Sequence, residues 1–191
     1  DMKKKLGYKG QQLIMYMPTF RGKADKIEVK GFGTRIHQHL YELDRRLSDE
    51  QILLIKVHPF IQDQIEISQY SHIKPIPEEF DSYEVLNACD VLITDYSSVM
   101  YDFAITKRKI ILFAYDYKEY IMERGMYENI KDYPFSIAET VDDVIRELRN
   151  DSGSADSEFI MKYGTYESRD AADKICRQVF SEENCCMVGK M

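Results

Sequence analysis

The stretch Asp90-Val91-Leu92-Ile93-Thr94-Asp95-Tyr96-Ser97-Ser98-Val99-Met100-Tyr101-Asp102 decides the fold of this chain. Its short apolar run, residues 91–93, predicts a buried parallel strand that ends at Thr94-Asp95. Two serines follow, and the pattern after them is typical of a helix. A strand that leads through a polar turn into a helix is the basic unit of an open α/β sheet.

The turn after this strand predicts a site for a nucleotide diphosphate. Ligands of open α/β sheets bind at the carboxyl ends of the strands, where helix N-termini offer unpaired N–H groups. Ser97 and Ser98 add hydroxyl donors beside Asp95. Asp102 shares the helix face of Ser98, where its carboxylate can accept hydrogen bonds from ribose hydroxyls. The alternative is an ordinary capped helix with a solvated Asp102.

Strand and helix patterns alternate along the rest of the chain. Further strands are predicted at residues 13–17, 52–57, 72–76 and 109–114, and helices at residues 34–47, 82–89, 141–148 and about 170–180. The helix at residues 82–89 is expected to begin with Ser82 as its cap. Because the strands are apolar throughout, they predict a parallel sheet that is buried on both faces. The fold class is therefore α/β, with a Rossmann-like parallel sheet covered by helices on both faces.

Length and composition restrict the classes of protein. The chain has 191 residues, of which 44% are hydrophobic and 31% charged, and this suits one soluble domain. Its net charge of -7 argues against a non-specific nucleic-acid binder and against electrostatic docking on an anionic membrane. No apolar run approaches the ~20 residues that span a bilayer. No secretory signal opens the chain either.

The cysteines predict neither a metal site nor disulfides. Cys89 and Cys176 fall in apolar helical patterns and are expected in the core, whereas Cys185-Cys186 lies in a polar tail. The sequence has no CxxC pair and no Cys/His ligand spacing, so a zinc site is not expected. Reduced thiols, as in the cytoplasm, are the default.

Three predicted strands end in polar or cationic residues. The segments are Pro18-Thr19-Phe20-Arg21, Lys56-Val57-His58-Pro59 and Thr94-Asp95-Tyr96-Ser97-Ser98. Parallel strands place their carboxyl ends on one edge, so these segments are expected to converge on one crevice.

The cationic residues of these segments suit phosphate chemistry. His58, which Pro59 restricts, can donate to a phosphate oxygen or move a proton near neutral pH. Lys56 can neutralise phosphate charge, and Arg21 can bind a phosphate with two hydrogen bonds. The alternatives are a structural histidine, a snorkelling lysine and an ordinary surface arginine. The other histidines are interpreted as non-functional: His37, His39 and His72.

A fourth segment, Arg124-Gly125-Met126-Tyr127, follows the strand at residues 109–114 by about ten residues. A loop at this place can close over the same edge of the sheet. An ordinary surface loop is the alternative.

Taken together, these segments resemble the CDP-glycerol:poly(glycerophosphate) glycerophosphotransferases, the teichoic-acid polymerase family. The matching residues extend over about 120 positions, and Leu92-Ile93-Thr94-Asp95-Tyr96-Ser97-Ser98 is the most specific of them. The strand at residues 110–114 with Tyr115-Asp116 also matches. Tyr133-Pro134-Phe135-Ser136 departs from the Pro-Gly-Pro-like turn of the family.

The resemblance implies a GT-B-like fold of two Rossmann-like lobes with the active site between them. It maps residues 1–181 onto the carboxyl-terminal, donor-nucleotide-binding lobe, followed by a frayed tail at residues 182–191. The amino-terminal acceptor lobe of the family carries a His-Gly motif, and no His-Gly occurs in this sequence. That lobe is therefore expected to be absent from this chain, and the isolated chain is expected to be inactive.

The implied reaction is transfer of glycerol phosphate from CDP-glycerol to a lipid-linked polyol-phosphate acceptor, with release of CMP. In this mapping Ser97 and Ser98 hold the pyrophosphate, Asp102 binds the ribose, and His58 stabilises charge or moves a proton near the leaving group. The other substrate-binding residues are expected to be Thr19, Arg21, Lys56, Asp95 and Arg124. The resemblance calls for no cofactor, metal or nucleic acid. It implies a peripheral enzyme at the cytoplasmic face of the bacterial membrane.

Three alternatives stay open at this point. The donor is CDP-ribitol or another CDP-polyol, because one extra set of hydroxyls leaves no trace in these motifs. The chain is a non-catalytic nucleotide-binding module, which the absent lobe favours. A flavodoxin-like response regulator or redox domain fits the alternating pattern, but it leaves Lys56-Val57-His58-Pro59 unexplained.

Overall fold

A six-stranded parallel sheet forms the centre of the computed structural model, which describes residues 2–21, 32–59, 65–150, 152–164 and 168–180. The strand order is β3-β2-β1-β4-β5-β6, the order of the Rossmann fold. The strands are β1 (Gln12–Met17), β2 (Gln51–Ile55), β3 (Ile73–Pro75), β4 (Val91–Thr94), β5 (Lys109–Phe113) and β6 (Ser136–Ala138). The predicted α/β fold is confirmed.

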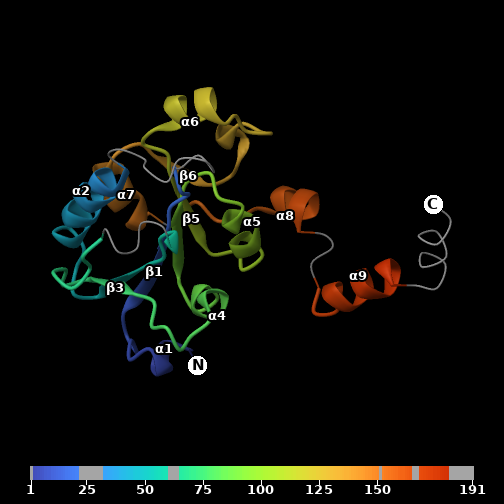
Figure 1. Cartoon of the computed structure of the whole chain (residues 1–191), viewed down its shortest axis with the longest axis horizontal. Helices are drawn as coiled ribbons and strands as arrows, with labels where there is room; N and C mark the ends of the chain where they lie inside the picture. Colours follow the sequence, from blue (N-terminus) through green and yellow to red (C-terminus); the bar gives the residue numbers. More distant parts are fainter. Residues whose placement is uncertain (1, 22–31, 60–64, 151, 165–167, 181–191) are drawn as a thin grey trace.

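Helices cover both faces of this sheet. In Figure 1, α2 and α7 lie on one face, α4, α5 and α8 lie on the other, and α6 lies beyond one end of the strands. The helices are α1 (Met2–Lys5), α2 (Phe32–Asp44), α4 (Ser82–Leu86), α5 (Val99–Ala104), α6 (Tyr117–Glu123), the 3-10 helix η1 (Ile130–Asp132), α7 (Val141–Leu148), α8 (Ser157–Tyr163) and α9 (Ala171–Val179).

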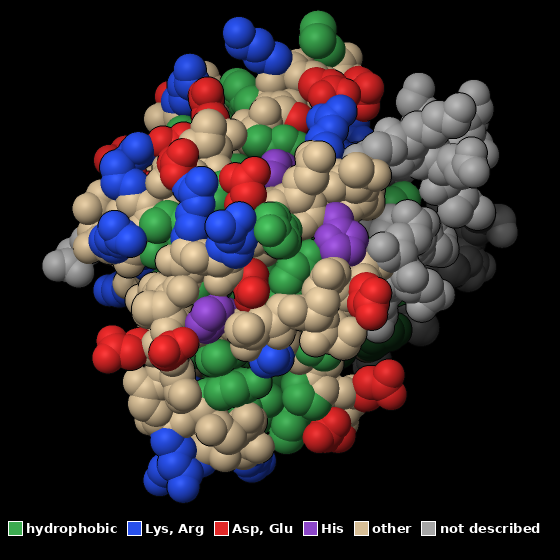
Figure 2. All heavy atoms as spheres, turned by 90° about the vertical axis from the view of Figure 1, so that its left-hand side faces the viewer, with side chains coloured by type: hydrophobic (Ala, Val, Ile, Leu, Met, Phe, Trp, Pro, Cys, Tyr) green, Lys and Arg blue, Asp and Glu red, His purple; other side chains and the backbone are tan. Residues whose placement is uncertain are grey.

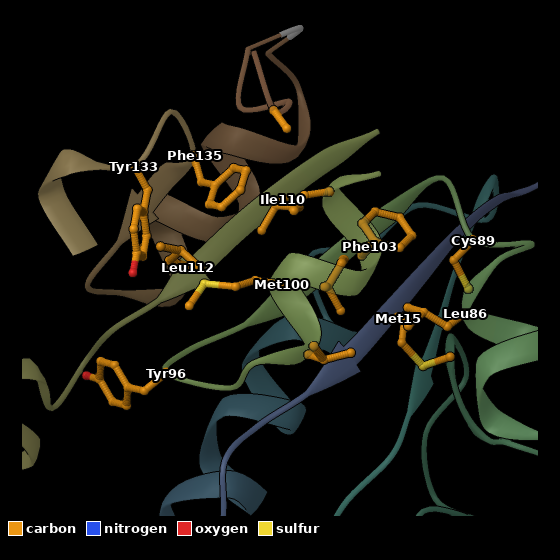
Figure 3. Close-up of a cluster of buried hydrophobic side chains, with 14 of the residues drawn as sticks. Met15, Leu86, Cys89, Tyr96, Met100, Phe103, Ile110, Leu112, Tyr133 and Phe135 are labelled. Atoms are coloured by element: carbon orange, nitrogen blue, oxygen red, sulfur yellow. The ribbon is translucent and has the colours of Figure 1, made fainter. Parts of the chain in front are cut away.

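Alternation along the strands divides the core into two layers. Ile14 and Tyr16 of β1 pack with α2 and α7, whereas Leu13 and Met15 pack on the opposite face with α4 and α5. Figure 3 shows this second layer, in which Phe103 of α5 lies among the buried hydrophobic side chains. Both layers are apolar, and this is why the strands read as continuous hydrophobic runs.

Local signals set several helix boundaries. The predicted helix at residues 141–148 has these bounds in α7, where Thr140 and Asp143 form a reciprocal capping box. Asp81, rather than the predicted Ser82, caps α4, because its carboxylate accepts from the backbone N–H groups of Tyr83 and Glu84. Ser82 instead lies inside the first turn.

Other expectations need correction or lie outside the described residues. Cys89 is buried, as expected, but Cys176 is exposed, because α9 has no buried residue. Five elements had no counterpart in the sequence analysis: α1, α6, η1, β6 and α8. The tail at residues 182–191 and Cys185-Cys186 are outside the described part of the chain. Within that part, no helix combines the length and apolarity needed to cross a membrane.

The face formed by α2 and α7 carries charges of both signs. Figure 2, which faces this side of the molecule, shows Lys and Arg side chains interspersed with Asp and Glu side chains. An ion pair joins this part of the chain to α7: Arg46, just after α2, contacts Asp142 of α7. Both side chains are exposed, so the pair contributes little to stability.

Gly153 provides a first test of the fold, since its backbone φ is +97° and atoms of β5 and β6 lie close to it. A Cβ there would come within 2.7 Å of Ser136 Oγ and 3.1 Å of the Ile110 carbonyl oxygen. We expect Gly153→Ala to lower the free energy of unfolding by about 2 kcal/mol through strain and crowding. Gly10→Ala is the control, because a Cβ at Gly10 meets nothing within 4 Å. Equal denaturation midpoints for the two variants would contradict the described packing.

Candidate functional site

The strand order reverses between β1 and β4, and open α/β sheets bind ligands at such a switch point. The two strands run side by side, with Met17 in register with Thr94. Thr94 Oγ1 donates to the Met17 carbonyl oxygen at 2.7 Å and joins the two strand ends. The polar residues that follow each strand therefore start next to each other.

Asp95 fastens the loop after β1 to the end of β4. Its carboxylate accepts hydrogen bonds from the Thr19 backbone N–H at 2.9 Å and from the Thr19 hydroxyl at 2.5 Å. The backbone N–H of Tyr96 donates to the same carboxylate at 2.6 Å. Asp95 is 1% exposed, so these bonds replace the water that an ionised carboxylate otherwise needs.

Arg21 joins three strand ends through its guanidinium group. Nη2 donates to Asp95 at 2.7 Å, Nε donates to Asp116 at 2.7 Å, and Nη1 donates to the Thr19 carbonyl oxygen at 2.6 Å. A second bond from Nη2 to Asp116, at 3.0 Å, makes that ion pair bidentate. The side chain of Arg21 is 9% exposed and those of Asp95 and Asp116 are 2% and 6% exposed. We call these three residues with Thr19 the strand-end clamp.

Aromatic rings surround the guanidinium group of the clamp. Its central carbon lies 4.9 Å from the ring centroid of Tyr96 and 5.1 Å from that of Tyr120. These two rings stack on each other with their centroids 3.9 Å apart. The Tyr96 hydroxyl also donates to Asp116 at 3.0 Å. Tyr120 belongs to α6, so the clamp attaches that helix to the sheet edge.

Burial and pairing act in opposite directions on the ionisable groups of the clamp. Burial alone would raise the pKa of Asp116, but the hydrogen bonds and charge of Arg21 outweigh it and hold that pKa below its usual range. Burial acts to lower the pKa of Arg21, whereas bonding to Asp116 and the charge of Asp95 raise it overall. Burial and the Asp116 charge raise the pKa of Tyr96. At neutral pH Arg21 is therefore a cation and Asp116 an anion, and the neighbouring Tyr96 is neutral.

The loop after β2 meets the clamp through two stacked rings. Phe20 lies between Thr19 and Arg21, and its ring stacks on His58 with centroids 4.8 Å apart and planes 25° apart. The imidazole of His58 is exposed at this edge. Lys56 is also exposed and donates from Nζ to Ser82 Oγ at 2.7 Å.

The two serines after β4 start the short helix α5. Ser98 occupies the N-cap position, but its backbone is helical and its side chain makes no capping hydrogen bond. The Ser97 Oγ accepts from the backbone N–H of Val99 at 3.4 Å. Ser98 is exposed and Ser97 is half-buried, so both residues lie near the surface at this edge of the sheet. The alternative that Ser98 simply caps the helix with its side chain is therefore wrong.

The described contacts of Asp102 and Arg124 are with tyrosines and not with residues of the clamp. Asp102 is exposed on α5 and accepts a hydrogen bond from the Tyr83 hydroxyl at 3.3 Å. Arg124 is exposed at the end of α6, and its guanidinium carbon lies 6.0 Å from the ring centroid of Tyr120. The Tyr120 ring thus connects Arg124 to the clamp.

The structure brings together some of the predicted site residues. The convergence of the three strand ends is confirmed by the Thr19, Arg21 and Asp95 contacts and by the stacking of His58 on Phe20. The described bonds of Arg21 go to groups of this chain, so in this structure Arg21 holds strand ends together. Its binding of a phosphate, like the ligand contacts of the other site residues, stays a prediction.

Asp116 is the clamp residue for which the sequence analysis gave no role. It occupies the N-cap position of α6, but its side chain makes no capping hydrogen bond there and turns to Arg21 instead. The available signal was its position three residues after the end of β5, a buried strand, just as Asp95 follows the buried strand β4. Among the residues that the structure describes, no group of three His, Cys, Asp or Glu side chains could hold a metal ion.

Comparison with known families gives a match over nearly the whole chain. Residues 1–181 match the family described as CDP-Glycerol:Poly(glycerophosphate) glycerophosphotransferase. The chain is 36% identical over 149 residues to a teichoic acid poly(ribitol-phosphate) polymerase of Bacillus spizizenii, a match that covers 75% of this chain and 23% of that protein. It is 29% identical over 178 residues to a teichoic acid glycerol-phosphate transferase of Staphylococcus aureus, covering 89% of this chain and 45% of that protein.

A solved structure gives the same result in three dimensions. A variant of the wall teichoic acid polymerase TagF superposes with a TM-score of 0.74 at 27% identity, covering 94% of this chain and 45% of that one. The chain thus spans less than half the length of each of these three proteins.

Proposed function

Because the chain belongs to the CDP-glycerol:poly(glycerophosphate) glycerophosphotransferase family, we propose that it is the donor-binding half of an enzyme that transfers a polyol phosphate from a CDP-activated donor. The acceptor is a polyol-phosphate chain of the teichoic-acid type, and CMP is released. The names of the relatives, which are polymerases and transferases of teichoic acid, support this assignment.

The observation that carries the proposal is the convergence of polar strand ends at the switch point of the sheet. Ser97 and Ser98 follow β4, His58 follows β2, and the loop with Thr19 follows β1. This is the edge at which Rossmann-type sheets bind nucleotides. Hydroxyl donors and a cationic Lys56 on this edge suit the pyrophosphate of the donor, and the exposed Asp102 suits its ribose.

The reaction needs positioning and charge stabilisation more than covalent help. An acceptor hydroxyl oxygen forms a bond to the phosphorus that carries the polyol. The bond from this phosphorus to the oxygen of CMP breaks, CMP leaves with the electron pair, and the proton of the acceptor hydroxyl passes to the leaving phosphate or to solvent. His58 stabilises the charge of the leaving phosphate or moves a proton there, and Arg124 approaches the same edge from α6.

We further propose that a second, amino-terminal lobe supplies most of the acceptor groove, so that transfer requires a longer polypeptide than this chain. The chain covers 45% of the TagF variant, which leaves room for such a lobe in that protein. Work at the cytoplasmic face of the bacterial membrane, on a lipid-linked acceptor, belongs to the same proposal. The resemblance to the family is its support.

CDP-glycerol is the proposed donor, and CDP-ribitol is the second candidate. The family description and the Staphylococcus aureus transferase favour glycerol phosphate. The Bacillus spizizenii relative, a poly(ribitol-phosphate) polymerase, favours ribitol phosphate. A structure of the TagF variant soaked with CDPG superposes on this chain with a TM-score of 0.72 at 25% identity.

Calorimetric titration of the chain tests the proposal directly. The ligands are CDP-glycerol, CDP-ribitol, CMP and UDP-glucose. We expect both CDP-polyols to bind more tightly than UDP-glucose, and the tighter of the two identifies the polyol. If neither the folded chain nor the longest natural polypeptide that contains it binds a CDP-polyol, the proposed function is wrong.

Asp102→Ala should weaken the binding of CDP-glycerol by between about 10-fold and 100-fold. The reason is that a hydrogen bond to a charged group contributes ~1.5–3 kcal/mol. Titration calorimetry of the variant measures the change. Tyr83→Phe is the matched control, because it removes the hydroxyl that bonds to Asp102 and leaves the carboxylate in place. Unchanged affinity in Asp102→Ala would show that this carboxylate does not bind the ribose.

A further inference from the structure

We infer that Phe20 is a positioning residue for His58, held in place by the strand-end clamp. The ring of Phe20 forms the platform on which the exposed imidazole rests. The inference rests on the proposed role of His58 in transfer. It adds a residue to that reaction for which neither the family comparison nor the sequence analysis gives a role.

The residues on both sides of Phe20 are bonded to buried carboxylates, Thr19 through its backbone and hydroxyl and Arg21 through its side chain. On one side, both the N–H and the hydroxyl of Thr19 donate to Asp95. On the other side, Arg21 donates to Asp95, to Asp116 and back to the Thr19 carbonyl oxygen. A three-residue segment bonded at both ends has little freedom to rotate. The clamp therefore holds the backbone from which the Phe20 ring projects.

The Phe20 ring has a support besides the imidazole. Phe20 is half-buried and packs against the core layer that includes Ile55 and Val57, the residues of β2 and its following loop that precede His58. Its ring is nearly parallel to the imidazole, with an interplanar angle of 25°. The residue thus links the clamp of β1, β4 and β5 to the loop after β2.

A platform of this kind matters because the χ2 torsion of histidine has broad, two-fold preferences. An exposed imidazole whose plane is free to turn presents its nitrogens to a phosphate in only a fraction of its orientations. Stacking on a fixed ring restricts the plane through the ring face and does not itself occupy the nitrogens at the ring edge. A misplaced catalytic group lowers the reaction rate strongly, because a displacement of about one ångström can reduce the rate by about 10²-fold.

The first test measures the ring contact itself by NMR on the chain. A stacked phenyl ring shifts the imidazole C–H resonances of His58 upfield. We expect Phe20→Leu to remove this shift and Phe20→Tyr to retain it. Tyr41→Leu, which removes an aromatic ring that is 54% exposed on α2, should leave the His58 resonances where they are. Unchanged His58 resonances in Phe20→Leu would overturn the inference.

The second test asks whether the clamp controls the platform. Asp116→Asn leaves Phe20 and His58 in the chain but weakens the charged pair with Arg21. We expect the His58 resonances to move from the wild-type positions toward those of Phe20→Leu. Wild-type positions in folded Asp116→Asn would show that the clamp does not hold Phe20.

The third test measures transfer in the longest natural polypeptide that contains this chain. We expect Phe20→Leu to lower kcat by between about 10-fold and 100-fold, while KM for CDP-glycerol stays within about twofold. Phe20→Tyr should restore kcat, because it restores the ring. A kcat unchanged by Phe20→Leu, or a loss that Phe20→Tyr does not rescue, would overturn the positioning role. His58→Ala with wild-type turnover would instead contradict the proposed role of His58, while the NMR shifts would still report the ring contact.

Discussion

Replacing Arg21 with methionine should lower the free energy of unfolding by ~3–5 kcal/mol at neutral pH. The substitution removes the cation of the clamp and leaves the carboxylates of Asp95 and Asp116 buried side by side. These groups are only 2% and 6% exposed, so water cannot replace the lost partner. Chemical denaturation followed by circular dichroism measures the difference.

Arg35→Met is the matched control for Arg21→Met. Arg35 also pairs with a distant carboxylate, that of Glu119 at 3.2 Å, but the two side chains are 46% and 53% exposed. Pairs of this kind contribute ~0–1 kcal/mol. Equal losses in the two variants would show that the clamp is not a buried ion network.

The pH dependence separates this electrostatic effect from a packing defect. The folded-state pKa of Asp116 lies below its unfolded value, so the stabilisation from this carboxylate is complete above the unfolded pKa of ~3.9 and is lost as the pH falls through the folded value. In Arg21→Met the Asp116 carboxylate loses the hydrogen bonds and charge that hold its pKa down, so it binds a proton more readily. The stability difference between the wild type and the variant should therefore shrink in acid, whereas a packing defect would persist.

His58→Ala should lower kcat for polyol-phosphate transfer by ~10²–10⁴-fold in the longest natural polypeptide that contains this chain. In the proposed mechanism His58 supplies charge or a proton that alanine cannot. Because the imidazole is exposed, the fold should survive the substitution. The measurement is release of CMP from CDP-glycerol in the presence of acceptor, together with a thermal unfolding curve.

His72→Ala is the control for His58→Ala. His72 directly precedes β3, which places it at the amino ends of the strands, on the edge opposite to His58. It bonds there to the carbonyl oxygen of Asp44 at 3.0 Å. Its loss should reduce stability slightly and leave kcat unchanged. Normal turnover in His58→Ala would remove His58 from the mechanism.

The two predictions assign different tasks to neighbouring side chains. The described side-chain hydrogen bonds of Arg21, Asp95 and Asp116 join these residues to one another and to Thr19 and Tyr96. These bonds stabilise the arrangement of the strand ends. His58, Ser98 and Asp102 are exposed on that edge and suit contacts with a ligand. Phe20 connects the two groups, because its chain neighbours Thr19 and Arg21 belong to the clamp and its ring stacks on His58.

The sequence by itself determined the fold class and the edge that carries the candidate site. Apolar strands such as residues 91–93 specify burial on both faces, and burial on both faces specifies a parallel sheet with helices around it. Because parallel strands bring their carboxyl ends to one edge, the convergence of Thr19, His58 and Ser97 also followed from the pattern. Caps with local partners, such as Thr140 and Asp143 of α7, belong to the same class of signal.

Short elements without strong periodicity were beyond the reach of the sequence. The strand β6 has only the three residues Ser136, Ile137 and Ala138, so it has no long run of apolar residues. Its middle residue Ile137 is only half-buried. The helix α6 has no buried residue and attaches through Tyr120 and Asp116 instead of an apolar stripe. Periodicity detects burial along one element, and these elements owe their place to contacts with others.

Only the tertiary structure decided what each polar residue at the edge binds. Arg21 and Asp116 are 95 positions apart in the sequence, and Thr19 and Asp95 are 76 apart. Local rules assign an aspartate before a helix to the helix cap, yet the Asp116 carboxylate turns to Arg21 because a buried guanidinium must be paired. Pattern and spacing thus determined which residues reach this edge of the sheet. Charge pairing across three strand ends determined which of them form the clamp and which stay exposed.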